Sequence, residues 1–260
     1  MNDMTLTQPE QNRLLDCLLD MGSLLLMAGG EISRVEDTLE RVGKAYGAKR
    51  MEVFVITSII SITLEFPESG ALTETRRIRS GGGTDFYRVE KINDLSRRLC
   101  ASPLPVERFE AELGALSSGQ KPFRAVLWGS VLAAGSFAVF FGGSPLDGVF
   151  AAAFGAVICL LQQKLGRTEL NTVASNLLIS LLIGLGVGLS AVLLPVLHMD
   201  KIMIGDIMLL IPGLAMTNAI RNMLVGDTIS GVVRLAESLI WAAALAGGFM
   251  VALAVVNILT

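Results

Sequence analysis

The second half of the chain is a series of long apolar segments, and this feature constrains the fold more than any other. Their approximate ranges are 125–141, 148–161, 173–197, 202–220 and 235–258. A helix of about twenty apolar residues crosses the hydrocarbon core of a bilayer, and a shorter one crosses where the bilayer thins or flanking residues help. The chain is also 52% hydrophobic and only 17% charged. The sequence therefore predicts a membrane domain of about five transmembrane helices over residues 124–260.

Small residues recur on single faces of these segments. Ser180, Gly184 and Gly188 follow one another at four-residue spacing in the segment 173–197. Residues four apart lie on one helix face, and small side chains there let two helices approach closely in lipid. The pattern predicts a closely packed helical bundle.

The first part of the chain has a different character, because most of the charged residues lie before residue 125. Apolar residues at helical spacing predict helices over 11–28, 31–46, 85–100 and 106–116. The segment 51–66 is rich in Val, Ile, Phe and Thr and predicts two strands or one long bent strand, with another strand over 71–79. Residues 1–123 are thus expected to form an α+β domain, and the whole chain an α-helical polytopic membrane protein with this domain at its N-terminus.

The stretch 201–234 is apolar enough to enter a bilayer but is interrupted by polar groups and a helix breaker. Pro212 has no N–H and crowds the carbonyl four residues earlier, so it breaks a helix. Ionisable groups at membrane depth usually mark a substrate or ion path. The pattern predicts a broken transmembrane helix along such a path, formed by Asp206, Pro212, Gly213, Thr217, Asn218 and Arg221.

A plainer interpretation of this stretch remains open. Proline kinks occur in many membrane helices for structural reasons alone, and Arg221 is then an anchor that extends its charged end to the membrane surface.

A second polar set is a candidate cytoplasmic gate. Glu31, Arg34 and Glu36 lie on the expected helix 31–46, Asn176 lies near the start of the third apolar segment, and Asp227 follows the fourth. Charged residues at helical spacing also form ordinary solvated faces with weak ion pairs. Asn and Asp before a helix also act as caps. Both alternatives stand beside the gate hypothesis.

The basic residues near the ends of the segments predict the orientation. All but Lys201 fall on one side: Lys121, Arg124, Lys164, Arg167, Arg221 and Arg234. Positive charge is enriched on the cytoplasmic side, so the N-terminal domain is expected in the cytoplasm and the C-terminus outside. The N-terminus has no basic stretch before an apolar core, so no cleavable signal peptide is expected.

Other classes of function find little support in the sequence. The three cysteines, Cys17, Cys100 and Cys159, are far apart, and His198 is the single histidine, so no metal site or cofactor is expected. No charge block indicates a nucleic-acid surface, and no nucleophile with a general base indicates an enzyme. A phosphate-binding loop that ends in Lys-Ser or Lys-Thr is also missing.

Four motifs carry a resemblance to a known family. They are AGGEISRVEDTLERVGKAYG, VFVITSIISITL, FFGGSPLDGVFAAAFGA and GDIMLLIPGLAMTNAIRNMLVGDTISG. In this order and spacing they resemble the threonine/serine exporter family, in particular the larger subunit of its two-chain members. The resemblance covers about residues 14–259. It implies a bacterial inner-membrane protein that exports threonine and serine or, as in some two-chain relatives, the dicarboxylate succinate. It also implies a small membrane partner subunit or a homo-oligomer.

The resemblance implies no set of functional residues, so the site residues above rest on the sequence alone. We expect a transporter subunit that works by alternating access on a proton or ion gradient. The alternative is a membrane-anchored sensor or enzyme whose active part is residues 1–120. Five apolar segments exceed what an anchor needs, and an acid inside one of them favours transport.

Overall fold

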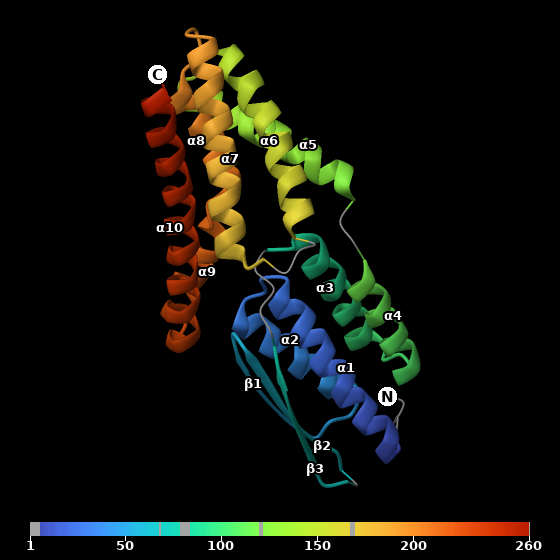
Figure 1. The fold of residues 1–260 in the computed structure, drawn as a ribbon. Coiled ribbons are helices and arrows are strands. Elements are labelled where there is room, and N and C mark those ends of the chain that lie inside the picture. Colours follow the sequence, from blue (N-terminus) through green and yellow to red (C-terminus); the bar gives the residue numbers. More distant parts are fainter. Residues whose placement is uncertain (1–5, 68, 79–83, 120–121, 167–169, 260) are drawn as a thin grey trace. The chain divides into compact units, whose positions relative to one another are not determined.

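The structure is a computed structural model that describes residues 6–67, 69–78, 84–119, 122–166 and 170–259 (Figure 1). It divides into two compact units. Unit 1 comprises residues 1–120 and 214–235, and unit 2 comprises residues 121–213 and 236–260. The expected domains, residues 1–123 and 124–260, stay a prediction.

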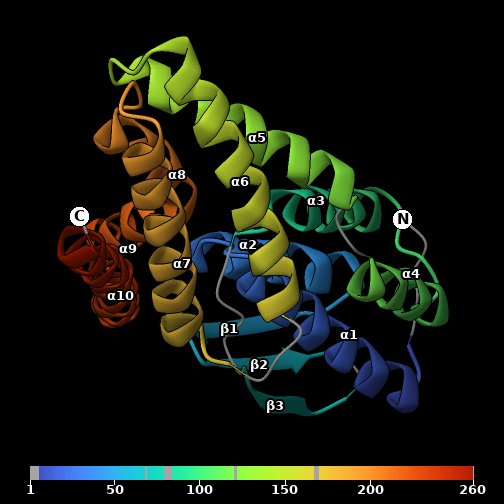
Figure 2. The ribbon, with the colours of Figure 1, turned by 45° about the horizontal axis from the view of Figure 1, so that its top comes forward.

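Unit 1 consists of helices packed on a small antiparallel sheet (Figure 2). The sheet order is β1-β2-β3, and the residues of β2 pair with both neighbours. The elements of its N-terminal part are α1 Gln8–Met27, α2 Ile32–Ala45, β1 Arg50–Ile56, β2 Ile59–Glu65, β3 Ala71–Arg77, α3 Phe86–Ala101 and α4 Val106–Ser118. The predicted helices and strands are confirmed, and the segment 51–66 forms two strands rather than one.

Side-chain alternation on β2 explains why the sheet forms a layer. Ile60, Ile62 and Leu64 point inward and are fully buried, while Ser61 and Thr63 between them form hydroxyl contacts with β3. Successive side chains of a strand point to opposite faces. The buried face packs against the apolar sides of the helices and forms the core of the unit.

Glycine ends the first two helices of unit 1. Gly29 has a φ of 82° and Gly47 a φ of 90°, in the left-handed region that a residue without Cβ enters at little cost. Gly30, which follows Gly29, has no room for a side chain, because an added Cβ would lie 2.7 Å from the Leu25 carbonyl oxygen. The α1–α2 connection is therefore tight.

Unit 2 contains the long apolar helices. They are α5 Phe123–Phe140, α6 Pro145–Leu165, α7 Thr172–Leu193 and α8 Met199–Leu210, together with the part of α10 Thr228–Leu259 from Ala236 on. In the sequence, α9 Gly213–Leu224 stands between α8 and α10 and belongs to unit 1 from Leu214 on. In the described chain, α5, α6, α7 and α10 are long and apolar enough to cross a membrane. The pair α8 and α9, bent by 50°, counts as a fifth span if taken together. The prediction of a polytopic helical membrane protein is thus confirmed in outline.

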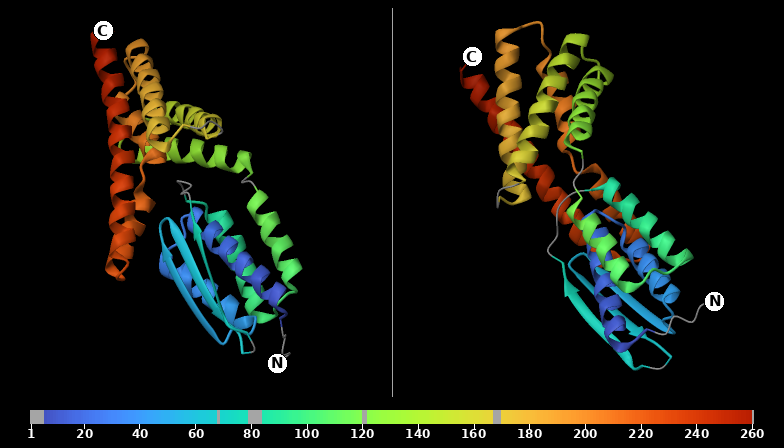
Figure 3. Two further views of the ribbon diagram at one scale, coloured as in Figure 1. Left: turned by 60° about the horizontal axis from the view of Figure 1, so that its bottom comes forward. Right: turned by 90° about the vertical axis from the view of Figure 1, so that its right-hand side faces the viewer.

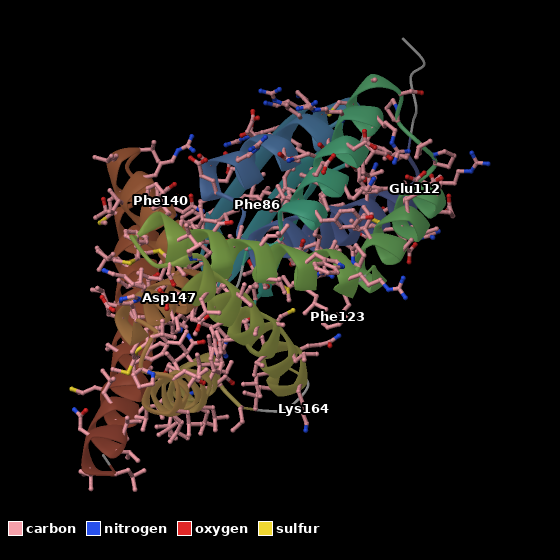
Figure 4. The ribbon with its side chains drawn as sticks, turned by 90° about the horizontal axis from the view of Figure 1, so that it is seen from above. Phe86, Glu112, Phe123, Phe140, Asp147 and Lys164 are labelled. Atoms are coloured by element: carbon pink, nitrogen blue, oxygen red, sulfur yellow. The ribbon has the colours of Figure 1, made fainter. Side chains whose placement is uncertain are left out.

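Several helices differ in length from the apolar segments. The helix over 148–161 begins at Pro145, because Ser144 and Asp147 form a capping box there, and it continues to Leu165 (Figure 4). The helix over 173–197 ends earlier, at Leu193, and the helix over 235–258 begins earlier, at Thr228. Hydropathy locates apolar residues, whereas caps and turns decide where a helix begins and ends.

The small residues bring helices of unit 2 together, as their spacing predicts. On α7, a Cβ added at Gly184 would lie 2.7 Å from Cβ of Ala252, and one at Gly188 would lie 2.6 Å from Val256, both on α10. The two helices lie side by side (Figure 3). Between α5 and α8 the approach is closer still, since an added Cβ on Gly205 would lie 2.5 Å from the Ala134 carbonyl oxygen.

We expect Gly205→Ala to destabilise unit 2. The new methyl group would meet backbone of α5 rather than a flexible side chain, and overpacking of this kind costs about 1–3 kcal/mol. Thermal unfolding of the purified protein in detergent measures the effect. Gly129→Ala on α5 is the matched control, because nothing lies within 4 Å of its added Cβ. An equal melting temperature for the two variants would contradict the close contact.

Candidate functional site

The structure divides the predicted site residues between the two units. Unit 2 contains Asp206, Pro212, Gly213 and Asn176. Unit 1 contains the others, which are Glu31, Arg34, Glu36, Thr217, Asn218, Arg221 and Asp227. Asp206 and Arg221 also lie on different helices, α8 and α9, so the straight face that a continuous helix would give them does not exist.

The helix break lies where the sequence predicts it. The Ile211 N–H donates to the Ile207 carbonyl at 2.9 Å, which is the last bond of α8, and the Gly213 N–H donates to the Ile211 carbonyl at 2.9 Å. Pro212 has no N–H to donate to the Met208 carbonyl, so helical bonding stops for two residues and restarts with α9. The broken helix is confirmed.

Asp206 is a carboxylate enclosed in the apolar core of unit 2. Its side chain is 0% exposed, and neither carboxylate oxygen has a hydrogen-bond partner among the described residues. Ile202, Met203 and Leu210 on the same helix are buried with it. An ionised carboxylate in such surroundings is costly unless a proton or a cation neutralises it. Asp206 is therefore the side chain of unit 2 best suited to bind one.

Two arginines of the C-terminal part of unit 1 bind the connection between α1 and α2. Nε of Arg221, on α9, lies 3.1 Å from Oε1 of Glu31, and Nη1 of Arg234, on α10, donates to the Gly30 carbonyl at 3.4 Å. Glu31 is the residue directly before α2. The turn formed by residues 29–31 thus contacts both arginines.

Glu36 is a second sheltered carboxyl group in unit 1, and the charge of Asp227 acts on it. Oε1 of Glu36 accepts a hydrogen bond from the Val55 N–H at 3.0 Å. Burial raises the pKa of Glu36 above its ordinary value, the hydrogen bond from Val55 lowers it, and the negative charge of Asp227 raises it further. Arg34, on the exposed face of the same helix, is solvated. Of the predicted gate residues at the start of α2 and on it, Glu31 and Glu36 are more sheltered than Arg34.

Asn222, which follows Arg221 in the sequence, is not among the predicted site residues. Its side chain is 0% exposed, and neither its amide nitrogen nor its amide oxygen has a partner in the described part of the chain. Its backbone carbonyl accepts from the Asp227 N–H at 2.9 Å. A buried amide without partners costs free energy and needs an explanation. One signal was present, since Asn218 and Asn222 are four residues apart and share a helix face.

The sequence analysis also missed a cluster around Asp147 in unit 2. This carboxylate is fully buried and accepts from the Ser144 N–H at 2.7 Å, the Ser144 hydroxyl at 2.8 Å and the His198 N–H at 2.8 Å. His198 Nδ1 also lies 2.9 Å from it. Asp147 thus connects the α5–α6 turn to the α7–α8 connection. The Ser-Pro-Leu-Asp capping box was the visible signal, but nothing in the sequence pointed to His198 as its partner.

The charged side chains of the described residues offer no metal centre. They include no group of three or more His, Cys, Asp or Glu residues that could hold a metal ion. The chemistry that the site residues can perform is binding, namely of a carboxylate by guanidinium groups and of a proton or cation by carboxylates.

These features define a polytopic helical membrane protein with a carboxylate buried in its apolar unit and a broken helix. The family model "ThrE: Putative threonine/serine exporter" matches residues 16–256, so the chain belongs to this family. The "Probable threonine/serine exporter" of Mycobacterium tuberculosis is 23% identical over 250 residues, which are 93% of this chain and 46% of that protein. The chain therefore spans about half the length of this relative. No solved structure matches the chain.

The raised pKa of Glu36 predicts a dependence of stability on pH. A carboxyl whose folded pKa is raised stabilises the fold while protonated, and this contribution is lost as the pH rises through the folded pKa. Glu36→Gln keeps an acceptor for Val55 but removes the charge. We therefore expect the variant to match the wild type near pH 4 and to exceed it at pH 7, by less than about 1 kcal/mol because Glu36 is only half-buried.

Thermal unfolding at several pH values measures this effect. Asp37→Asn, on the same helix and in an exposed ion pair with Arg41, is the control and should show no such gain at pH 7. A Glu36→Gln variant that is less stable than the wild type at pH 7 would contradict the prediction.

The unpartnered amide of Asn222 predicts an unusual response to an apolar substitution. Asn222→Leu replaces the amide with a side chain of similar size that needs no hydrogen bond, so the melting temperature should stay the same or rise. Asn171→Leu is the control, because Asn171 caps α7 by accepting from the Ala174 N–H at 2.9 Å. Its loss should cost about 0.5–2 kcal/mol. A larger loss at Asn222 than at Asn171 would mean that the Asn222 amide has a partner.

Proposed function

We propose that this chain is a subunit of a membrane exporter that moves small carboxylate-bearing metabolites, threonine and serine in the first place, out of the cytoplasm. Membership in the exporter family and the long apolar helices support the proposal. The observation that carries it is Asp206, a fully buried carboxylate with no hydrogen-bond partner among the described residues, six residues before a helix break. A membrane anchor does not require a buried carboxylate, whereas a transporter driven by a gradient binds its coupling proton or ion at such a group.

Asp206 is proposed to bind the coupling proton or cation. A bound proton or cation removes the cost of the buried charge, so occupancy of this site favours the enclosed conformation and an empty, ionised site favours one in which Asp206 reaches water. The break at Pro212 supplies the place where α8 and α9 change their relation during such a cycle. These two features support the proposal that the chain works by alternating access driven by an ion gradient.

Arg221 is proposed to bind the substrate carboxylate. Guanidinium groups bind carboxylates through two parallel N–H donors, and the N-terminus of α9 after Gly213 is a second place where a carboxylate is favoured. Threonine, serine and the dicarboxylate succinate all carry this group. The name of the Mycobacterium tuberculosis relative, "Probable threonine/serine exporter", favours the first two.

A second membrane part is proposed to complete the exporter. The proposed candidates are a small membrane partner subunit, as the resemblance to two-chain family members implies, or a second copy of this chain. The proposed location is the bacterial inner membrane, with the N-terminal part in the cytoplasm and the C-terminus outside. Of the basic residues behind this orientation, Lys121 and Arg167 lie outside the described residues.

A membrane-anchored sensor or enzyme is the rival function, with residues 1–120 as its active part. No observation favours it, since the family is one of exporters and its model matches both parts of the chain. Transport measurements separate the two functions directly.

Asp206→Asn should abolish coupled export while the protein remains in the membrane. Asparagine keeps the size of the side chain but binds neither a proton nor a cation in the same way, so we expect efflux to fall at least about tenfold, a change of about 1.4 kcal/mol in the barrier. Asp200→Asn, at the exposed start of the same helix, is the matched control and should keep its efflux.

The measurement is efflux from cells preloaded with labelled threonine, serine or succinate, with this chain alone and with its small membrane partner, at equal membrane levels of protein. Efflux of one substrate class only with the partner would establish a two-chain exporter. Wild-type efflux by the Asp206→Asn variant would refute the role of Asp206. No efflux under any condition would favour the sensor or enzyme.

A further inference from the structure

We propose that the Glu31 carboxylate is an internal occupant of a carboxylate-binding site on Arg221, and that a small carboxylate-bearing solute binds there by displacing it. The proposal deepens the function proposed above and rests on it for the identity of the solute. All of the residues that carry it belong to unit 1.

The Arg221–Glu31 pair differs from the other ion pairs of α2 in its exposure. The Arg221 side chain is 63% exposed and the Glu31 side chain only 16%. In the pairs Arg41–Asp37 and Lys44–Glu40 both partners are exposed, as in ordinary solvated pairs. A solute can therefore reach the guanidinium of Arg221 while Glu31 contacts it from the sheltered side.

The contact with Glu31 also leaves donors for a second carboxylate. It involves Nε of Arg221, at 3.1 Å from Oε1 of Glu31. A guanidinium carries five N–H donors arranged for two-point binding of a carboxylate, and most of the Arg221 side chain is exposed. An arriving carboxylate can bind before Glu31 leaves, so the exchange never leaves the positive charge of Arg221 without a counter-charge.

The N-terminus of α2 is a second favourable position for the Glu31 carboxylate after its displacement from Arg221. It occupies the position directly before α2, yet its side chain makes no capping hydrogen bond there. A carboxylate at the N-terminus of a helix is stabilised by the unpaired N–H groups and the dipole of the helix. The Ser33 hydroxyl, which donates to Oε1 of Glu31 at 3.3 Å, lies in this first turn. Release from Arg221 is therefore compensated locally.

The buried amide of Asn222 supports a second arrangement of α9, besides the one in which Arg221 contacts Glu31. Asn222 follows Arg221 directly, and its buried amide has no partner among the described residues. Such a group is costly, so an arrangement of α9 that gives it partners is favourable. Meanwhile the bond from Arg234 to the Gly30 carbonyl keeps the turn attached to α10 while Arg221 changes its partner.

The test is equilibrium binding of labelled threonine, and separately of succinate, to the full chain in lipid nanodiscs. Removing an internal competitor should tighten binding, so Glu31→Gln is expected to lower the apparent Kd about three- to tenfold. Glu31→Asp should act in the same direction, because its carboxylate is one methylene too short for Arg221. Arg221→Gln should lose the binding of the carboxylate solute.

Two controls separate displacement from a merely structural ion pair. Glu40→Gln removes the acid of the exposed Glu40–Lys44 pair of the same helix and should leave the Kd unchanged. Threoninamide and succinamide lack the carboxylate, so Glu31→Gln should not tighten their binding. Weaker or equal threonine and succinate binding by Glu31→Gln and Glu31→Asp would overturn the proposal, and so would equal tightening for the amides or the absence of binding by every variant.

The outcomes also separate this inference from the proposed function. Tighter binding by Glu31→Gln in a protein that exports no solute would support the exchange and refute the exporter. Export by the wild type without tighter binding in the Glu31 variants would support the exporter and refute the exchange.

Discussion

The missing N–H of Pro212 is the constraint on which the rest of the structure depends. Without it the helix begun at Met199 stops at Leu210, and a new helix begins at Gly213. The break assigns Asp206 to the apolar core of unit 2 and gives the residues from Leu214 to Leu235 to unit 1. One apolar stretch of sequence thus serves two units, each with polar groups that a simple membrane span would not contain.

Each unit encloses a polar side chain that has no hydrogen-bond partner in the described part of the chain. In unit 2 it is Asp206, and in unit 1 it is Asn222. Asp147 is, by contrast, a buried carboxylate whose oxygens accept hydrogen bonds from Ser144 and His198. The contrast separates a structural acid, which joins two connections, from groups whose unsatisfied state is costly and therefore suited to binding and conformational change.

Much of the fold follows from local sequence patterns. The helices and strands of unit 1 lie within a few residues of their predicted ranges, because their apolar residues repeat at helical or strand spacing. The small residues of α7 contact α10 as their spacing indicates. Helix ends at Pro145 and Leu193 escaped prediction, since caps and turns rather than hydropathy determine them.

The sequence by itself determined the apolar helices, the α+β character of the first part and the break at Pro212, because each depends on neighbouring residues. Only the tertiary structure decided which residues meet. It joined Arg234 to Gly30, 204 residues away, and His198 to Asp147, 51 residues away. It also buried Asp206 and Asn222 where no other described residue bonds to their side chains. Contacts between distant segments depend on how whole helices pack, and no periodic pattern in the sequence records that packing.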